Sequence, residues 1–236
     1  NMRINAEAGD IALGEGTEVS AGANITVLAD NGNINQDTDV TAKTGTIDVE
    51  AFAGNVIMKQ GVTSKTENNG SIRYAAADDI MLANVDAGEG GVIFDAKSVS
   101  HQADGKITAK AMAVRVDGKF GSDGSPINLG VSQLSIEAPG GVYITNDRDA
   151  AVVTADASEA RFQVNRVNED FTTVEMPENT AAAGGVIEGL VAENGDVVTV
   201  NNGDLTVESK VEANGRAAIS TESGDVVVSG AIEAHN

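Results

Sequence analysis

The sequence predicts an all-β chain folded as a parallel β-helix, a solenoid with about 22 residues and three short strands in each coil. Three observations predict this fold: a short strand-like unit recurs, its apolar centres repeat with a near-constant spacing, and the composition suits repetition. Hydrophobic residues make up 41% of the 236 residues but aromatic residues only 3%, with Gly 27 and Pro 3. Val, Ile, Leu and Ala would therefore fill the interior, and the chain would turn many tight corners.

The recurring unit is Gly or a small residue, then Asn, Asp, Ser or Thr, then Ile, Val or Leu, any residue, and a second apolar residue. Apolar side chains at positions i and i+2 lie on one face of a strand. The Gly-polar pair before them suits a corner, because Gly accepts a positive φ and Asn or Asp tolerates it. The copies are Gly9–Leu13, Ala23–Val27, Gly45–Val49, Gly54–Met58, Gly70–Tyr74, Gly105–Ala109, Gly203–Val207 and Gly224–Val228. The core positions expected from them are Ile11, Leu13, Ile25, Val27, Ile47, Val49, Val56, Ile72, Leu205, Val207 and Val226.

The spacing of the apolar strand centres indicates the architecture. Ile25 and Ile47 are 22 residues apart, and near the C-terminal end Leu205 and Val226 are 21 apart. A step of this size lies in the range of solenoid repeats. Three strands per coil would stack on the next coil by parallel hydrogen bonding and enclose an aliphatic column. Similar steps separate Ile34 from Val56, Val211 from Ile232 and, as a third series, Val19, Val40, Val62 and Val85.

We divide the chain into solenoid coils over 1–145, an irregular excursion or hairpin over 146–184, and resumed coils over 185–236. Strand-turn-strand patterning around Asn165–Asp170 predicts the hairpin, and the small residues Ala181–Gly185 close the stretch. Insertions in solenoids project from corners and often form the binding face, although a loop that covers the core or a strand edge is the alternative. The remaining roughly 200 residues suffice for about nine coils, a rod on the order of 43 Å long.

Two other architectures share part of this pattern. An antiparallel sandwich also has short strands at roughly 8–12-residue spacing. A leucine-rich horseshoe has a similar period, but this chain lacks the Leu-x-x-Leu-x-Leu core and the helical arc of that fold. The parallel β-helix accounts best for three strand series that share one period.

The Gly-Asn/Asp-Ile-x-Val units, set in Ala/Ser/Thr-rich coils, resemble the shaft repeats of filamentous-haemagglutinin-type bacterial surface adhesins. The resemblance covers about 190 residues, on both sides of the excursion. It implies a right-handed β-helix that is extracellular and takes part in adhesion, biofilm or cell-cell contact. The Asn-Pro-Asn-Gly/Leu signature of the secretion domain is absent. The resemblance therefore implies a segment from the interior of a shaft in a longer chain.

Charge and composition exclude several classes of partner. Asp+Glu number 36 against 15 Lys+Arg, a formal net charge of -21, so the clustered cations that bind nucleic acid or anionic lipid are missing. With Cys 0 there is no disulfide, thiol chemistry or thiolate metal site. No run of 18 apolar residues occurs, and Asn1–Ile4 already has a strand pattern, so we expect neither a membrane-spanning segment nor a signal peptide.

The sequence gives little support for catalysis. His101 and His235 stand outside any His-Glu-x-x-His spacing, and no Gly-x-Ser-x-Gly elbow occurs. Paired carboxylates could serve a polysaccharide-degrading β-helix enzyme, and Asp78–Asp79, Glu169–Asp170 and Asp147 with Asp149 are such pairs. However, Trp 0 and Tyr 2 leave almost nothing with which to line a sugar cleft. We therefore expect a non-catalytic protein.

Calcium is the cofactor that remains open. Divalent ions relieve the self-repulsion of an acidic rod, and Ca²⁺ takes six to eight oxygen ligands. The candidate ligands are Asp147 with Asp149, and Asp123 beside Gly124 and Ser125. Neither group matches an EF-hand loop or the Gly-Gly-x-Gly-x-Asp nonapeptide. The alternative is a solvated acidic face that keeps the rod soluble.

These observations together predict a structural and binding segment of a large extracellular bacterial adhesin or surface filament. It would act as a stiff spacer, with recognition carried by loops such as 146–184. Its partners would be neighbouring repeats of a longer chain or identical subunits, and a cell-surface protein or glycan. A self-assembling filament subunit and, less favoured, a polysaccharide-degrading enzyme are the alternatives.

Overall fold

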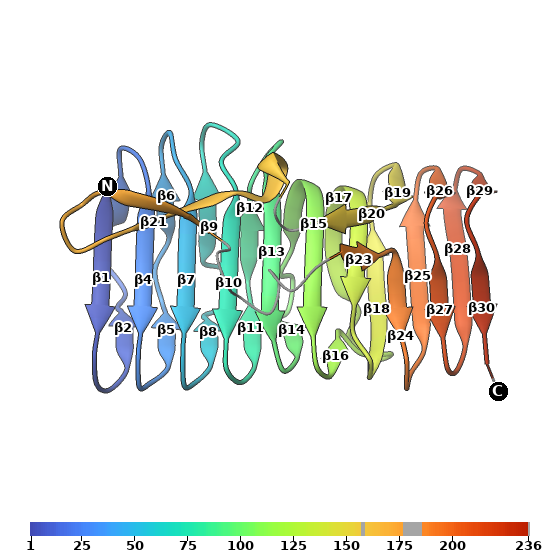
Figure 1. The fold of residues 1–236 in the computed structure, drawn as a ribbon, viewed down its shortest axis with the longest axis horizontal. Helices are drawn as coiled ribbons and strands as arrows, with labels where there is room; N and C mark the ends of the chain where they lie inside the picture. The colour runs from blue at the N-terminus through green and yellow to red at the C-terminus, as the bar shows by residue number, and fades with distance from the viewer. Residues whose placement is uncertain (157–158, 177–185, 236) are drawn as a thin grey trace.

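A computed structural model describes residues 1–156, 159–176 and 186–235 (Figure 1). The chain is an all-β solenoid of about 10 turns, built from parallel stacked coils of about 22 residues. The predicted β-helix is therefore confirmed. Among the described residues, no helix is long and apolar enough to span a membrane.

The N-terminal coils have three faces, each a ladder of parallel strands. Face A contains β1 (Met2–Ala6), β4 (Ile25–Ala29), β7 (Ile47–Ala51), β10 (Ile72–Ala76) and β13 (Gly91–Ala96). Face B contains β2 (Ile11–Leu13), β5 (Ile34–Gln36), β8 (Val56–Met58), β11 (Ile80–Leu82), β14 (Val99–His101) and β16 (Lys119–Phe120). Face C contains β3 (Val19–Ala21), β6 (Val40–Ala42), β9 (Thr63–Thr66) and β12 (Asn84–Asp86).

The cross-section changes in the middle of the rod. The long strands β15 (Ile107–Val116) and β17 (Ile127–Glu137) each continue face C with their first half and face A with their second half. Beyond them, β18 (Gly141–Asn146) extends faces B and C together, while face A divides. The C-terminal ladders are β18 with β25 (Val197–Asn202) and β28 (Ala217–Ser223), β19 (Ala150–Val152) with β26 (Leu205–Val207) and β29 (Val226–Val228), and β24 (Leu190–Ala192) with β27 (Val211–Ala213) and β30 (Ile232–Ala234).

Strand register confirms the sequence period with one exception. Ile25 pairs with Ile47, and Leu205 pairs with Val226, as the spacing predicts. In the third series, however, Val40 pairs with Ser64 instead of Val62. Ser64 points inward because its hydroxyl joins a fully buried hydrogen-bonded trio with the side chains of Gln36 and Tyr74, at 2.9 Å and 2.6 Å.

The interior is the expected aliphatic column. Of the predicted core residues all are buried except Val226, which is 42% exposed because β29 in the last described coil is paired on one side only. Three of the few aromatic side chains, Tyr74, Phe94 and Phe120, stack along the same column on successive coils, with ring centroids 6.3 Å apart at each step. The buried apolar residues thus form one cluster that continues from coil to coil.

At several corners, glycine is required for a reason other than the positive φ that the sequence analysis predicted. At Gly54 the backbone is not in the left-handed region, but a Cβ there would lie 2.6 Å from the carbonyl oxygen of Gly32 on the preceding coil. Close approach of stacked corners therefore requires glycine. The polar residue that follows links the coils, because Asn33 Oδ1 accepts a hydrogen bond from the Asn55 amide at 2.9 Å, and Asn55 Oδ1 accepts one from the Asp79 amide at 3.1 Å.

The excursion starts later than the sequence-based boundary at Asn146. Asn146 ends β18 and Ala150–Val152 form β19, and both strands are paired in the solenoid, so the chain leaves the coils after Val152 and rejoins them at Leu190. In between, β20 (Thr154–Asp156) pairs antiparallel with β23 (Val186–Glu188), η1 (Ala160–Phe162) is a single 3-10 turn, and β21 (Val164–Val167) forms the predicted hairpin with β22 (Thr173–Met176). The predicted closing segment Ala181–Gly185 lies outside the described residues.

Candidate functional site

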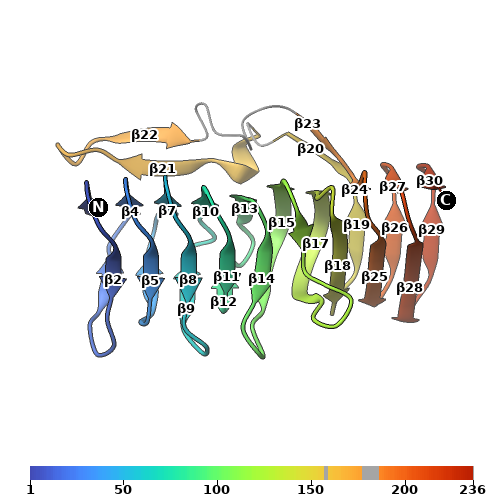
Figure 2. The same ribbon diagram turned by 90° about the horizontal axis from the view of Figure 1, so that it is seen from below.

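Two features of the outer surface are candidates for function: the hairpin of the excursion and a polar groove. Figure 2 shows the hairpin lying along face A, with its strands crossing the solenoid strands. A binding loop that projects from a corner was the expectation from the sequence, but the hairpin does not project. Residues 159–176 instead match the alternative, a loop that covers the solenoid wall.

The hairpin backbone is held by hydroxyl groups of the solenoid. The amide of Asn165 donates to Thr46 Oγ1, and the amide of Val167 donates to Thr26 Oγ1, each at 2.8 Å. Arg3 at the first coil donates to the Val167 carbonyl at 2.7 Å. A strand that crosses other strands cannot join their ladder, so these side chains satisfy its backbone groups.

A buried ion cluster lies beneath β21. Arg73 of β10 and Arg166 of β21 share the two carboxylates of β7, Asp48 and Glu50. Arg73 Nη1 lies 2.7 Å from Asp48 Oδ1, and Arg166 Nε lies 2.6 Å from Asp48 Oδ2. Burial by itself would lower the pKa of the Arg73 guanidinium, but the two carboxylates outweigh it and raise that pKa, so Arg73 is charged. Two cations and two anions leave the cluster neutral.

A second apolar cluster lies on the outside of face A. It consists of Ile93, Ala111, Ala113, Ala155, Phe162 and Ile187, all at most 1% exposed. Phe162 enters it from η1, over Gly91, where an added Cβ would lie 2.8 Å from the Phe162 ring. The excursion therefore has an apolar core of its own against the solenoid, and burial of this core stabilises its docking on face A.

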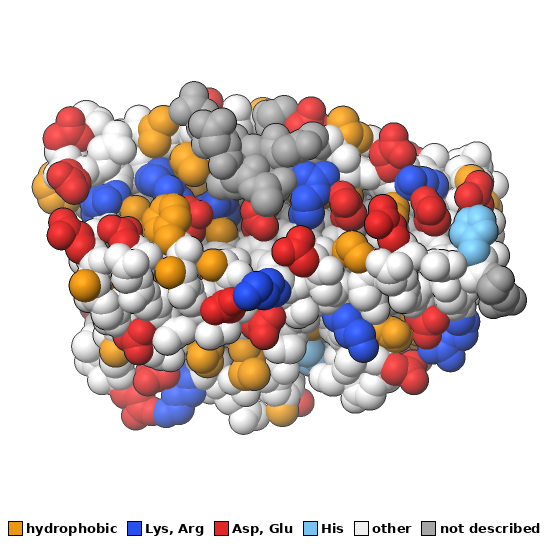
Figure 3. Space-filling model, turned by 60° about the horizontal axis from the view of Figure 1, so that its bottom comes forward, with side chains coloured by type: hydrophobic (Ala, Val, Ile, Leu, Met, Phe, Trp, Pro, Cys, Tyr) orange, Lys and Arg blue, Asp and Glu red, His pale blue; other side chains and the backbone are white. Residues whose placement is uncertain are grey.

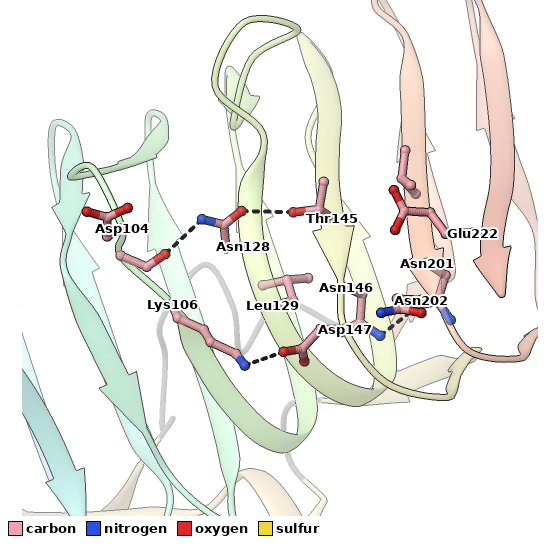
Figure 4. A pocket seen from close by; sticks show the side chains of 12 residues that line it. Asp104, Lys106, Asn128, Leu129, Thr145, Asn146, Asp147, Asn201, Asn202 and Glu222 are labelled. Carbon is pink, nitrogen blue, oxygen red and sulfur yellow. Dashed lines mark hydrogen bonds and ion pairs between the residues drawn. The ribbon is translucent and has the colours of Figure 1, made fainter.

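The polar groove lies where β17, β18 and β25 succeed one another (Figure 4). Its volume is about 430 Å³, within the range of ligand sites. Because it follows the stacking direction, neighbouring coils each contribute a side chain. The residues that line it are Asp104, Gly105, Lys106, Asn128, Leu129, Thr145, Asn146, Asp147, Val200, Asn201, Asn202 and Glu222.

Hydrogen bonds between coils organise the polar groove. Thr145 Oγ1 donates to Asn128 Oδ1 at 2.9 Å, and Lys106 Nζ lies 2.5 Å from Asp147 Oδ2. Below them the buried Asn146 donates to Asn201 Oδ1 at 2.8 Å. These contacts fix the side chains of four successive coils relative to one another.

The three predicted calcium ligands are not brought together. Asp147 pairs with Lys106, Asp149 Oδ1 accepts the Asp204 amide at 2.9 Å, and Asp123 Oδ1 lies 3.0 Å from Arg216 Nη2. Among the described residues there is no group of three or more His, Cys, Asp or Glu side chains that could hold a metal ion. Each aspartate has a partner within the protein.

The two histidines, Asp78 and Asp170 likewise each interact with a different neighbour. His101 Nε2 lies 3.5 Å from Ser125 Oγ, and His235 lies 3.7 Å from Glu233. Asp78 pairs with Lys97, while hydrogen bonds from the Thr172 hydroxyl and amide lower the pKa of Asp170 at the hairpin turn. Figure 3 shows carboxylates along the length of one face with fewer Lys and Arg side chains among them.

Sequence reasoning missed the residues of the ion cluster and most of the groove. A usable signal existed for the cluster, because Asp48 and Arg73 directly follow Ile47 and Ile72 at the same register position of adjacent coils. Opposite charges at equivalent positions of two repeats predict an ion pair across the ladder. Arg166 could not be found this way, since its place depends on where the excursion folds back.

No family model, curated protein or solved structure matches this chain.

Proposed function

We propose that the chain is a non-catalytic structural and binding segment of a large extracellular bacterial adhesin or surface filament, acting as a stiff spacer. The observation that supports this most is the uninterrupted parallel ladder of about 10 turns around one aliphatic column. Each coil is fixed to the next by strand hydrogen bonds and corner Asn/Asp contacts, so bending would break many bonds at once. Recognition would belong to features beside the column, the docked excursion and the polar groove.

Small-angle X-ray scattering and negative-stain electron microscopy of the purified protein test the spacer role. At about 4.8 Å per coil, 10 turns give a rod on the order of 48 Å long. Discrete straight rods whose length does not change with concentration support the proposal. Particles that bend freely, with a broad distribution of end-to-end distances, contradict it.

A second candidate is a self-assembling filament subunit. It is favoured by the last described coil, where Val226, Val228 and Ile232 are 42–47% exposed at strands paired on one side only. Another coil, from a longer chain or an identical subunit, would bury them. Light scattering over a concentration series separates the two cases: filaments of one-coil width require self-assembly, and Val228→Lys would then abolish them.

We consider a polysaccharide-degrading enzyme the weakest candidate. Among the residues that the structure describes, the acidic side chains lining the polar groove are Asp104, Asp147 and Glu222, and Asp147 is already paired with Lys106. The same described lining contains no aromatic side chain. Release of reducing ends from acidic or neutral polysaccharides, lost in Glu222→Gln, would overturn the non-catalytic proposal.

A further inference from the structure

A small polar arrangement on face A shows how this solenoid binds a strand that crosses its coils. The Thr46 hydroxyl has two acceptors within reach of its proton, Asn24 Oδ1 on the adjacent coil at 3.2 Å and the Asn165 carbonyl at 3.4 Å, and donation to either leaves the lone pairs of its oxygen available as an acceptor. That acceptor takes the amide of Asn165 at 2.8 Å. Two residues after Thr46, Asp48 accepts the guanidinium of Arg166, the residue next to Asn165. One Asn-Thr pair and one carboxylate thus bind both the backbone and the cation of the crossing strand.

The same arrangement recurs in the polar groove. Thr145 Oγ1 donates to Asn128 Oδ1 on the adjacent coil at 2.9 Å, and Asp147 again lies two residues after the threonine (Figure 4). Asp147 uses Oδ2 for Lys106, and Oδ1 faces Gly130, which leaves space because it has no side chain. Within 1–156, 159–176 and 186–235, no hydrogen bond reaches Thr145 Oγ1 from a donor. The acceptor that binds the Asn165 amide on face A thus has an equivalent in the groove, Thr145 Oγ1, that receives no hydrogen bond from the described residues.

The charge of the polar groove differs from that of the covered site. On face A, Asp48 and Glu50 are neutralised by two arginines. In the groove the pair of Lys106 and Asp147 is neutral, while Asp104 and Glu222, on coils at opposite sides of Thr145, are exposed and have no ion-pair partner in the described part of the chain. The complement of such a groove carries positive charge.

We propose that the polar groove binds an extended, arginine- or lysine-bearing segment of a partner polypeptide, which crosses the coils as the hairpin crosses face A. A backbone amide of the segment donates to Thr145 Oγ1, and its cationic side chains pair with Asp104 and Glu222. Four coil steps of about 4.8 Å span about 19 Å, which corresponds to roughly six extended residues. This inference rests on the recognition part of the proposed function and specifies its ligand as a basic peptide.

The test uses a fluorescein-labelled seven-residue peptide of alternating Arg and Thr, titrated with the whole chain at low salt and followed by fluorescence anisotropy. Alternation places all arginines on one side of the extended peptide. We expect saturable one-to-one binding that Asp104→Asn/Glu222→Gln weakens about 5-fold, as two exposed ion pairs would. Thr145→Val should weaken it further by several fold, whereas Thr145→Ser, which keeps the hydroxyl, should not.

The matched control is Glu18→Gln/Glu193→Gln, which removes two exposed carboxylates away from the groove. If this control weakens binding as much as the groove variant does, the peptide is attracted only by the net charge of the rod, and the proposal is wrong. It is also wrong if spermine or a glucosamine oligomer competes as well as unlabelled peptide does and Thr145→Val has no effect on binding. In that case Thr145 Oγ1 does not accept a backbone amide of the peptide. Straight rods without peptide binding would overturn this inference and leave the spacer role intact.

Discussion

At the scale of single residues, the corner asparagines and aspartates do most to keep the coils in register. At several corners such a side chain accepts the backbone amide of its equivalent on the next coil, as Asp10 does for Asn33 at 2.7 Å and Asp204 does for Asp225 at 2.9 Å. The side chain replaces a backbone partner at a corner where the strand ladder is interrupted. A slip of one residue would break these bonds and turn the aliphatic side chains outward.

Ile47→Asp tests the assignment of the inward face. Ile47 is 0% exposed in the column, so an aspartate there would be buried without a partner and should reduce the free energy of unfolding by about 4 kcal/mol or more. Urea denaturation followed by circular dichroism measures the change. Ile57→Asp, on the outward side of β8 where Ile57 is 38% exposed, is the control and should cost less than about 1 kcal/mol. Equal losses would contradict the assigned faces.

Tyr74 gives the protein a predictable sensitivity to alkali. Burial raises the pKa of this phenol, and a hydrogen bond with Ser64 only partly opposes the effect. The folded state therefore keeps the proton above about pH 10, where the unfolded chain loses it, so this contribution to stability is complete below pH 10 and declines above it.

Urea midpoints measured between about pH 9 and pH 11 should fall steeply for the native sequence and less steeply for Tyr74→Phe. The slopes are compared instead of the absolute midpoints, because the variant also removes the hydrogen bond that the Tyr74 hydroxyl donates to Gln36 Oε1. The other tyrosine, Tyr143, has a raised pKa as well and is present in both proteins. Equal slopes for the two proteins would show that the pKa of Tyr74 is the same in the folded and unfolded states.

At the scale of elements, the hairpin of the excursion acts as a strap across the first coils. It contacts Thr26 in β4 and Thr46 just before β7, and the adjoining η1 extends the contact to the next coil, where the hydroxyl of Ser71, just before β10, donates to the Arg161 carbonyl at 3.1 Å. Because these strands belong to different coils, their separation requires the hairpin to detach. The strap should therefore couple the unfolding of the N-terminal coils.

Arg166→Met tests this coupling. The substitution leaves Asp48 and Glu50 with Arg73 alone, a net negative charge beneath the hairpin, and should cost about 3 kcal/mol of docking free energy. Hydrogen exchange should then accelerate in 159–176 and in β4 and β7, and remain unchanged in β25 and β28. Arg216→Met, which breaks a half-exposed ion pair with Asp123, is the control and should leave the hairpin protected. Uniform acceleration along the rod would contradict a local strap.

At the scale of the whole molecule, the formal net charge of -21 on one rod opposes compaction. Most ion pairs are exposed, such as Lys97 with Asp78, and compensate little of it. Cation binding or screening should consequently stabilise the protein. Whether calcium stabilises it more than sodium at the same ionic strength distinguishes a specific calcium site from a solvated acidic surface.

Calorimetry should show a melting temperature that rises between about 10 mM and 150 mM NaCl, as the Debye length falls. CaCl2 at matched ionic strength should give a similar rise, because Asp123, Asp147 and Asp149 each have another partner. A much larger increase of the melting temperature with calcium, abolished by chelator and by Asp147→Asn/Asp149→Asn, would instead show that Asp147 and Asp149 bind calcium. A melting temperature independent of NaCl would contradict the repulsion argument.

The sequence alone determined the fold because solenoid repeats are local. The spacing of Ile25 and Ile47 predicts their pairing, since each coil buries its apolar face only against its neighbours. Tertiary structure decided what the period does not encode. Ser64, not Val62, pairs with Val40 and joins the buried Gln36 and Tyr74, and Arg166 reaches Asp48 only because the excursion folds back over more than a hundred residues of chain. The polar groove likewise depends on side chains from several coils, whose meeting follows from stacking and from the absent side chain of Gly130.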